Sequence, residues 1–120
     1  MKVRYELSAE QLALFDDRIA YWQERLGLND WRVKRSKRRT SNMAEVKIEV
    51  VHRIASYAVG DFGPHEITDQ VIDGTACHEM LHLLLAELKH ITTESEDHDL
   101  RMAAEHRVVI TLERILTGTA

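Results

Sequence analysis

The sequence predicts a single α+β domain over residues 1–120, in which one helix, three strands of a mostly antiparallel sheet and two further helices follow one another. Three observations support this prediction. The chain has 120 residues, which is about the length of one domain. Apolar residues recur at helical spacing towards both ends. In the middle of the chain they alternate with polar residues, which is typical of a sheet with one buried face.

The first helix is expected over residues 9–26. Ser8 and Gln11 have the spacing of a capping box, in which each side chain bonds a backbone amide of the other. Gly27 is a typical residue just beyond a helix C-terminus. Five apolar side chains between these signals form one helical face: Leu12, Phe15, Ile19, Trp22 and Leu26.

Three strands are expected between residues 31 and 59. The middle strand, 44–50, alternates Ala, Val and Ile with Glu and Lys. A shorter strand begins at Trp31, whose side chain is expected in the core, and leads into a basic hairpin over 32–39. The segment 54–59 (IASYAV) is rich in β-forming residues and predicts the third strand.

The second helix is expected to begin at Thr68 or Asp69 and to end near Leu88. It is apolar almost all round, so we expect it to be buried. Cys77, the one cysteine of the chain, is expected to be a buried thiol within this helix.

A third helix is expected to begin at a capping box formed by Thr93 and Glu96 and to end before Gly118. His106 and Arg107 are expected on its exposed faces. Its apolar stripe contains one carboxylate: Met102, Glu105, Val109, Leu112 and Leu116.

The second helix contains the sequence HEMLH at residues 78–82, an H-E-x-x-H pattern. Residues four apart share a helical face, so the imidazoles of His78 and His82 can converge on one metal ion. Glu79 lies one residue round the helix, where it reaches a water on the metal and serves as general base. An unpaired polar group in so apolar a helix costs about 1–3 kcal/mol, and a bound metal removes that cost. The residues therefore predict one Zn²⁺ per chain.

A catalytic zinc site needs a third protein ligand, and two candidates lie on the third helix. Glu105 lies on the apolar stripe, where a carboxylate needs a partner. His98 lies on the same stripe two helical turns earlier, about 10 Å away along the axis, so one ion cannot take both. We favour Glu105 because of its position on the stripe, and His98 is the alternative third ligand.

These residues resemble those of the zincin metallopeptidases. HEMLH followed by a glutamate on the next helix is similar to their glutamate-ligand branch, the gluzincins. The segments TACHEMLHLLLAEL and AAEHRVVITLERIL, with WRVKR before them, resemble small metallopeptidases of bacteriophages and prophages. A more distant resemblance is to SprT-like proteases, whose third ligand is a histidine near the start of a later helix. His98 fits that spacing, although Asp99 stands where a glycine usually follows.

The gluzincin resemblance implies a minimal zincin-like fold with Zn²⁺ on His78, His82 and Glu105. It implies that Glu79 is the base in hydrolysis of a peptide or protein substrate. The predicted function is therefore that of a zinc-dependent metallopeptidase.

The same resemblance implies that substrate backbone adds to the sheet edge beside the active helix. By this resemblance the edge is the strand 54–59. Tyr57 in that strand is a candidate transition-state donor, and the alternative is an aromatic side chain packed in the sheet, which we favour.

The charge pattern leaves a second function open. The net charge of -4 argues against a globally basic nucleic-acid binder. Residues 32–39 nevertheless concentrate six basic side chains: Arg32, Lys34, Arg35, Lys37, Arg38 and Arg39. The alternative is a non-catalytic, metal-stabilised module that binds protein or nucleic acid through this segment. A purely structural metal site has no need of Glu79, so that residue favours the enzyme.

The sequence also bears on the compartment. No apolar run is long enough to span a membrane, and the N-terminal residues lack the apolar core of a signal peptide. One cysteine suits a reducing environment. We therefore expect the cytoplasm of a bacterium or of a phage-infected host.

Overall fold

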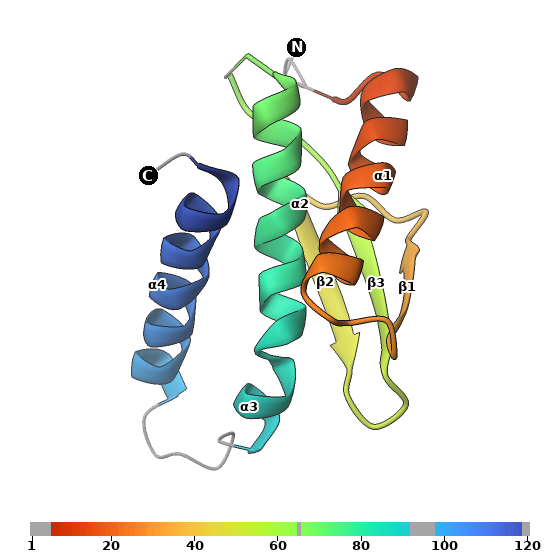
Figure 1. Cartoon of the computed structure of the whole chain (residues 1–120). Helices are drawn as coiled ribbons and strands as arrows, with labels where there is room; N and C mark the ends of the chain where they lie inside the picture. The colour runs from red at the N-terminus through yellow and green to blue at the C-terminus, as the bar shows by residue number, and fades with distance from the viewer. Residues whose placement is uncertain (1–5, 65, 92–97, 119–120) are drawn as a thin grey trace.

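The computed structural model describes residues 6–64, 66–91 and 98–118. Helix α1 and helix α2 lie side by side over one face of the sheet, and α4 lies against α2 on the side away from α1 (Figure 1). The predicted α+β class and element order are confirmed. The elements are α1 (Ala9–Arg25), β1 (Arg32–Arg35), β2 (Ala44–Glu49), β3 (Ile54–Val59), α2 (Asp69–Leu84), α3 (Ala86–Ile91) and α4 (His98–Thr117).

Helix α1 is capped as its sequence predicts. The Ser8 hydroxyl accepts a hydrogen bond from the backbone N–H of Gln11, and the Gln11 side chain accepts one from the N–H of Ser8. The helix ends one residue earlier than expected, and Gly27 follows with a φ of 72°. Its buried side chains belong to the predicted face: Phe15, Ile19 and Trp22.

The sheet is mixed, with the strand order β1-β3-β2. Strands β2 and β3 pair antiparallel over six residue pairs, whereas β1 pairs parallel with β3 over four. Along β2, partly buried Val46 and Ile48 alternate with exposed Lys47 and Glu49. The alternation predicted for this strand is therefore confirmed, and its apolar side packs against the core.

Two predictions about the sheet are wrong. Residues 54–59 form the central strand, so the edge strand that packs against α2 is β2. Residues 32–39 form no hairpin, because β1 is parallel to its neighbour and the chain crosses one end of β3 before it enters β2. At this crossing the N–H of Gly60 donates to the carbonyl oxygen of Met43. Neighbouring residues in sequence do not reveal such a crossing, because it depends on which strands pair.

Helix α2 is the central element and packs against α1, α4 and β2. Thr68 is its N-cap, and its hydroxyl accepts a hydrogen bond from the N–H of Val71. The predicted single helix to Leu88 is wrong at its end, because α2 stops at Leu84 and α3 is a separate short helix. Leu84 and Leu88 are 40% and 62% exposed, whereas Ala86 between them is only 5% exposed, so burial is incomplete from the end of α2 onward. The buried apolar side chains of α2 are Ile72, Ala76, Cys77, Met80, Leu81 and Leu83.

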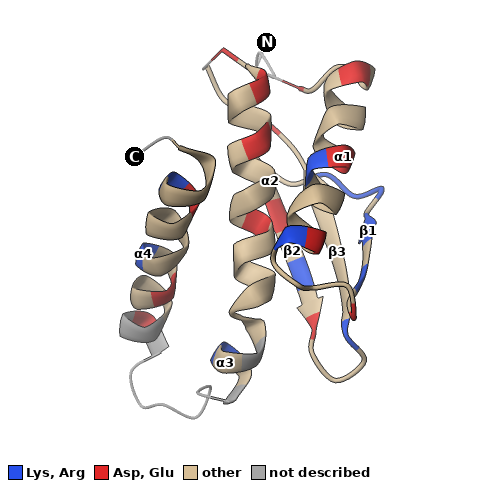
Figure 2. Ribbon diagram, viewed as in Figure 1, with Lys and Arg blue, Asp and Glu red and all other residues tan. Residues whose placement is uncertain are grey.

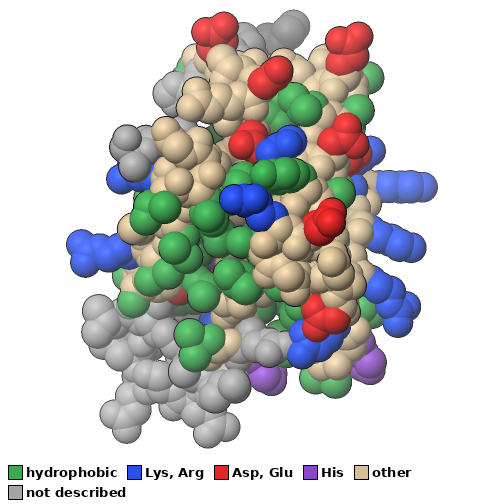
Figure 3. All heavy atoms as spheres, viewed as in Figure 1, with side chains coloured by type: hydrophobic (Ala, Val, Ile, Leu, Met, Phe, Trp, Pro, Cys, Tyr) green, Lys and Arg blue, Asp and Glu red, His purple; other side chains and the backbone are tan. Residues whose placement is uncertain are grey.

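Helix α4 runs along α2 with Val109 fully buried in the interface. It ends at Thr117, before Gly118 with its φ of 72°, as predicted. The predicted capping box of Thr93 and Glu96 lies outside the described residues. Hydrophobic side chains gather on the surface where α4 meets α2 (Figure 3). In the described part of the chain, each helix is too short or too polar to cross a membrane.

Candidate metal centre and active site

Helix α2 places the two histidines of the H-E-x-x-H sequence one turn apart on one face. The Nε2 atoms of His78 and His82 are 3.2 Å apart, and the two ring centroids are 4.9 Å apart. Both side chains are less than a quarter exposed, at 21% and 24%. The structure therefore brings the two imidazoles together as their spacing predicts.

Helix α4 brings a carboxylate to the other ring nitrogen of each histidine. Oε1 of Glu105 lies 3.2 Å from Nδ1 of His82, and Oε1 of Glu113 lies 3.1 Å from Nδ1 of His78. Oε2 of Glu105 also forms an ion pair of 3.2 Å with Nζ of Lys89. The side chain of Glu105 is 10% exposed, so its predicted orientation towards the core is correct. Its role as a zinc ligand stays a prediction.

A third imidazole, that of His106, lies beside the pair. Its ring centroid is 5.6 Å from that of His78 and 6.3 Å from that of His82. The candidate ligand atoms of the three histidines all lie within 4.8 Å of one another. His106 is exposed, as expected, and no role was predicted for it or for Glu113. Their seven-residue spacing, which puts both on one helical face, was the available signal.

Tyr57 is not among the residues that line the hollows at this site, and its contacts favour the packed aromatic over the transition-state donor. Its ring packs against Phe15 with centroids 5.7 Å apart, and its hydroxyl donates a hydrogen bond of 2.6 Å to Asp16. Tyr57 therefore reaches the core under α1, and it is only 5% exposed. The alternative, an aromatic packed in the sheet, is confirmed.

His98, the alternative third ligand, begins α4. Its side chain lies outside the described residues, so its assignment stays a prediction.

Among the described residues, Glu79 is the one charged residue that is buried, with 6% of its surface exposed. Among those residues, its carboxylate takes part in no hydrogen bond and no ion pair. Burial raises the pKa of Glu79 to about 7, and the neighbouring His78 opposes that rise. A carboxyl group with a pKa near neutrality can both accept and release a proton under physiological conditions.

The two imidazoles of the pair differ in their electrostatic surroundings. The hydrogen bond to Glu113 raises the pKa of His78 above its ordinary value. Desolvation lowers the pKa of His82, and its contact with Glu105 only partly offsets that effect. A neutral imidazole keeps the lone pair that a metal ion requires, so burial of His82 favours its ligand form.

Two hollows meet at this site, and both are lined by Ala44 of β2 together with His78 and Glu79. One, of about 510 Å³, extends towards α3 and is bordered by Val46, Lys89 and Glu105, among others. The other, of about 810 Å³, extends along α4 and is bordered by Gln70, Thr75, His106 and Arg114, among others. The edge strand β2 therefore forms one wall of a cleft that passes over Glu79.

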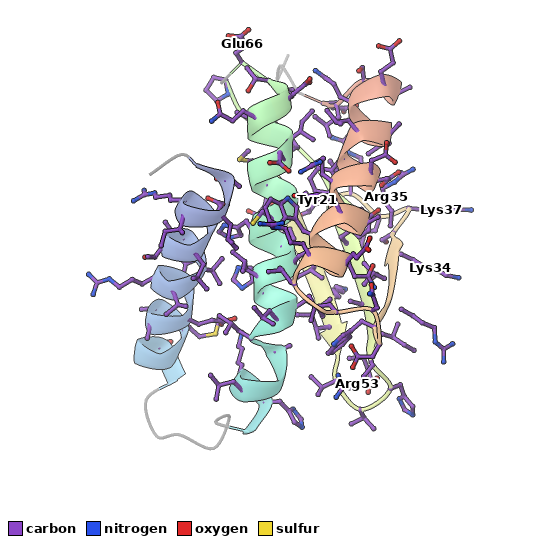
Figure 4. The ribbon with its side chains drawn as sticks, viewed as in Figure 1. Tyr21, Lys34, Arg35, Lys37, Arg53 and Glu66 are labelled. Carbon is purple, nitrogen blue, oxygen red and sulfur yellow. The ribbon has the colours of Figure 1, made fainter. Side chains whose placement is uncertain are left out.

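The basic segment lies on the opposite side of the molecule from α4 (Figure 2). Three of its six side chains pair with carboxylates: Arg35 with Asp16, Arg38 with Glu45, and Arg39 with Glu6. Lys34 and Lys37 project outward from the β1 edge (Figure 4). The segment is therefore partly neutralised by the protein's own acidic side chains. One of these, Glu45, also lines the hollow beside His78 and Glu79.

Comparisons of the chain with protein-family models, with curated proteins and with solved structures found no significant match. The candidate function therefore depends on the geometry of the site and on the sequence pattern.

Proposed function

We propose that this protein is a zinc-dependent peptidase in which Glu79 is the general base. One observation carries the proposal: a buried carboxylate without a hydrogen-bond partner among the described residues lies next to two imidazoles whose Nε2 atoms are 3.2 Å apart. A folded protein gains nothing from burying such a carboxylate for packing alone, because desolvation of the charge is costly. Its retention in the cleft is explained by a chemical role.

The donor set fits a zinc ion. Zinc in proteins bonds imidazole nitrogen at 2.0–2.1 Å, so two ligand nitrogens in a tetrahedral site lie about 3.3 Å apart. The Nε2 atoms of His78 and His82 are 3.2 Å apart, close to that separation. A third ligand comes from α4, whose Glu105 and His106 both lie beside the pair. When bound there, Zn²⁺ supplies Lewis-acid chemistry that polarises a carbonyl and lowers the pKa of water.

Glu79 does the proton transfer in this proposal. It accepts a proton from the attacking water and donates it to the nitrogen of the leaving amine. Burial raises the pKa of Glu79 above its ordinary value, which makes the carboxylate a stronger base towards that water. The burial of Glu79 keeps bulk water from competing with the proton transfer.

The edge strand β2 is the proposed site for the substrate backbone. It is paired with β3 on one side, and its other side borders the cleft over Glu79. An extended peptide can add to such an edge through main-chain hydrogen bonds, which do not depend on the sequence of the substrate. The open edge supports an extended peptide segment as the proposed substrate. Cys77 is a free, buried thiol, which suits a reducing environment. The proposed compartment is therefore the cytoplasm.

The experiment compares wild type with Glu79→Gln in zinc content, melting temperature and hydrolysis of casein. Glutamine keeps the shape but has no basicity, so hydrolysis should fall by about 10²–10⁴-fold. Zinc content should stay near one ion per chain, and stability should be unchanged or higher, because a neutral amide costs less to bury than a carboxylate.

The matched control is Glu24→Gln, an exposed position on α1 that should leave all three measurements unchanged. His82→Ala should lose zinc and stability together. If Glu79→Gln lost zinc as completely as His82→Ala, Glu79 would be a ligand and the proposed mechanism would be wrong.

A second candidate, a metal-stabilised module that binds nucleic acid, is favoured by the outward projection of Lys34 and Lys37. It predicts salt-dependent binding of an oligonucleotide that a Lys34→Ala, Lys37→Ala double variant weakens. In that case Glu79→Gln should leave binding unchanged.

A further inference from the structure

The two histidines of the pair use their ring nitrogens in the same way. In each, Nε2 faces the other histidine and Nδ1 faces a carboxylate of α4. When both Nδ1–H groups donate to carboxylates, each imidazole has its lone pair on Nε2, so the two lone pairs face each other across 3.2 Å. A proton or a metal ion between them removes the repulsion.

Metal-binding histidines generally use their two ring nitrogens in this way. A ligating imidazole usually donates its second ring N–H to a carboxylate or carbonyl, which fixes the orientation of the ring. Glu113 meets this description for His78, and Glu105 meets it for His82. Both carboxylates come from α4, so one helix orients both rings.

The contacts of Glu105 argue against a place for it among the ligands. Its Oε1 already faces Nδ1 of His82, the ring nitrogen that does not face His78. Its Oε2 is engaged by the ammonium group of Lys89. Both oxygens are thus held away from the point where the two Nε2 atoms converge.

His106 is the side chain of α4 that completes the set. Its candidate ligand nitrogen lies within 4.8 Å of those of His78 and His82. That separation is wider than the roughly 3.3 Å edge of a tetrahedral zinc site, so the three nitrogens must approach one another to share an ion. His106 is the exposed member of the three, so its side chain has the most room to adjust.

We propose that the zinc ligands of this protein are His78, His82 and His106, and that Glu105 and Glu113 are positioning residues that orient His82 and His78. The inference rests on the zinc site of the proposed function. It differs from the gluzincin ligand set at one position, where His106 takes the place of Glu105. A site of three neutral imidazoles leaves the full charge of a divalent ion in place, whereas a carboxylate ligand would offset part of it.

The test measures zinc affinity by competition with a chromophoric chelator for the wild type and for His106→Ala, Glu105→Gln and Glu113→Gln. His106→Ala should weaken zinc binding by more than about 100-fold, beyond the 10–100-fold that loss of an outer partner typically costs. Glu105→Gln and Glu113→Gln should each keep one zinc per chain, with a loss of about 10–100-fold or less. His52→Ala, at an exposed histidine in the β2–β3 turn, is the matched control and should bind as the wild type does.

Cobalt substitution supplies a second readout that does not depend on activity. The visible spectrum of bound Co²⁺ reports the ligand set, so it should change in His106→Ala and stay close to wild type in Glu105→Gln. His106 is exposed on a helix, and alanine is a strong helix former, so the variant should fold. Circular dichroism checks this before the titrations.

The outcomes separate the two proposals. If the wild type binds zinc, and Glu105→Gln abolishes binding while His106→Ala retains it, Glu105 is the ligand and only the present inference fails. If the wild type binds no zinc, the proposed function fails with it.

Discussion

The indole of Trp22 on α1 donates a hydrogen bond of 2.8 Å to Oδ1 of Asp73 on α2. The same oxygen accepts a second bond of 2.6 Å from Nε of Arg18. Asp73 thus joins two side chains of α1 to the helix that carries His78 and Glu79. Trp22 is 2% exposed, so its indole N–H would be buried without a partner if this carboxylate were removed.

Asp73→Ala should therefore lower the free energy of unfolding by about 1–2 kcal/mol, measured by urea denaturation. Solvent weakens these bonds, because the side chains of Arg18 and Asp73 are 29% and 26% exposed, so the loss lies in the lower part of the range for bonds to charged groups. Asp73→Asn keeps an acceptor oxygen and should lose less. The control Asp17→Ala, at an exposed position on α1, should stay within about 0.5 kcal/mol of wild type. Equal losses from Asp73→Ala and Asp17→Ala would show that the link between the helices contributes nothing.

Removal of the metal should destabilise the protein. A zinc ion on ligands from α2 and α4 ties these helices together, and binding at 100–1000 times the dissociation constant contributes about 3–4 kcal/mol. A strong chelator should lower the melting temperature by roughly 10 °C, and added zinc should restore it. The chelator should have no further effect on His82→Ala. An unchanged melting curve, with zinc loss verified by elemental analysis, would contradict coupling between the site and the fold.

Tyr57 gives the protein a pH-dependent stability at alkaline pH. Burial is the main cause that raises the pKa of its hydroxyl, and the hydrogen bond to Asp16 raises it further. The folded state therefore holds the phenol proton more tightly than the unfolded chain. The resulting stability is fully present below the ordinary pKa of about 10 and is lost as the pH rises above it.

Tyr57→Phe should accordingly cost about 1 kcal/mol at pH 7 and less at pH 11. The measurement is the urea midpoint of wild type and variant at both pH values. Tyr21→Phe, at a position that is 41% exposed, is the control and should show no such convergence. Zinc content should equal that of wild type in Tyr57→Phe, since the hydroxyl bonds Asp16 of α1 and none of the histidines.

Two glycines should respond to alanine in opposite ways. A Cβ at Gly60 would lie 1.9 Å from the carbonyl oxygen of Thr40 and 2.4 Å from that of Asn42, where the chain crosses the end of β3. Gly60→Ala must displace backbone, so we expect a loss of at least 1–3 kcal/mol. A Cβ at Gly74, within α2, would meet nothing within 4 Å, and Gly74→Ala should stabilise the helix by about 0.5–1 kcal/mol. Thermal unfolding of both variants tests this, and a neutral Gly60→Ala would contradict the close crossing.

Local patterns in the sequence determined the elements that depend on neighbouring residues. The capping box of Ser8 and Gln11, the alternation along β2 and the meeting of His78 with His82 all follow from periodicities of a few residues. These features need no knowledge of the rest of the chain, because helix and strand geometry alone fix which side chains share a face.

Tertiary structure decided everything that depends on how distant segments pack. The sequence could not show that β3 lies between β1 and β2, which moves the sheet edge to β2, or that the Tyr57 hydroxyl bonds Asp16 of α1. Nor could it show which ring nitrogen Glu105 meets, or that His106 lies beside the histidine pair. The physical reason is that the rotation and height of α4 against α2 are set by packing around Val109, and periodicity within α4 carries no information about its partner.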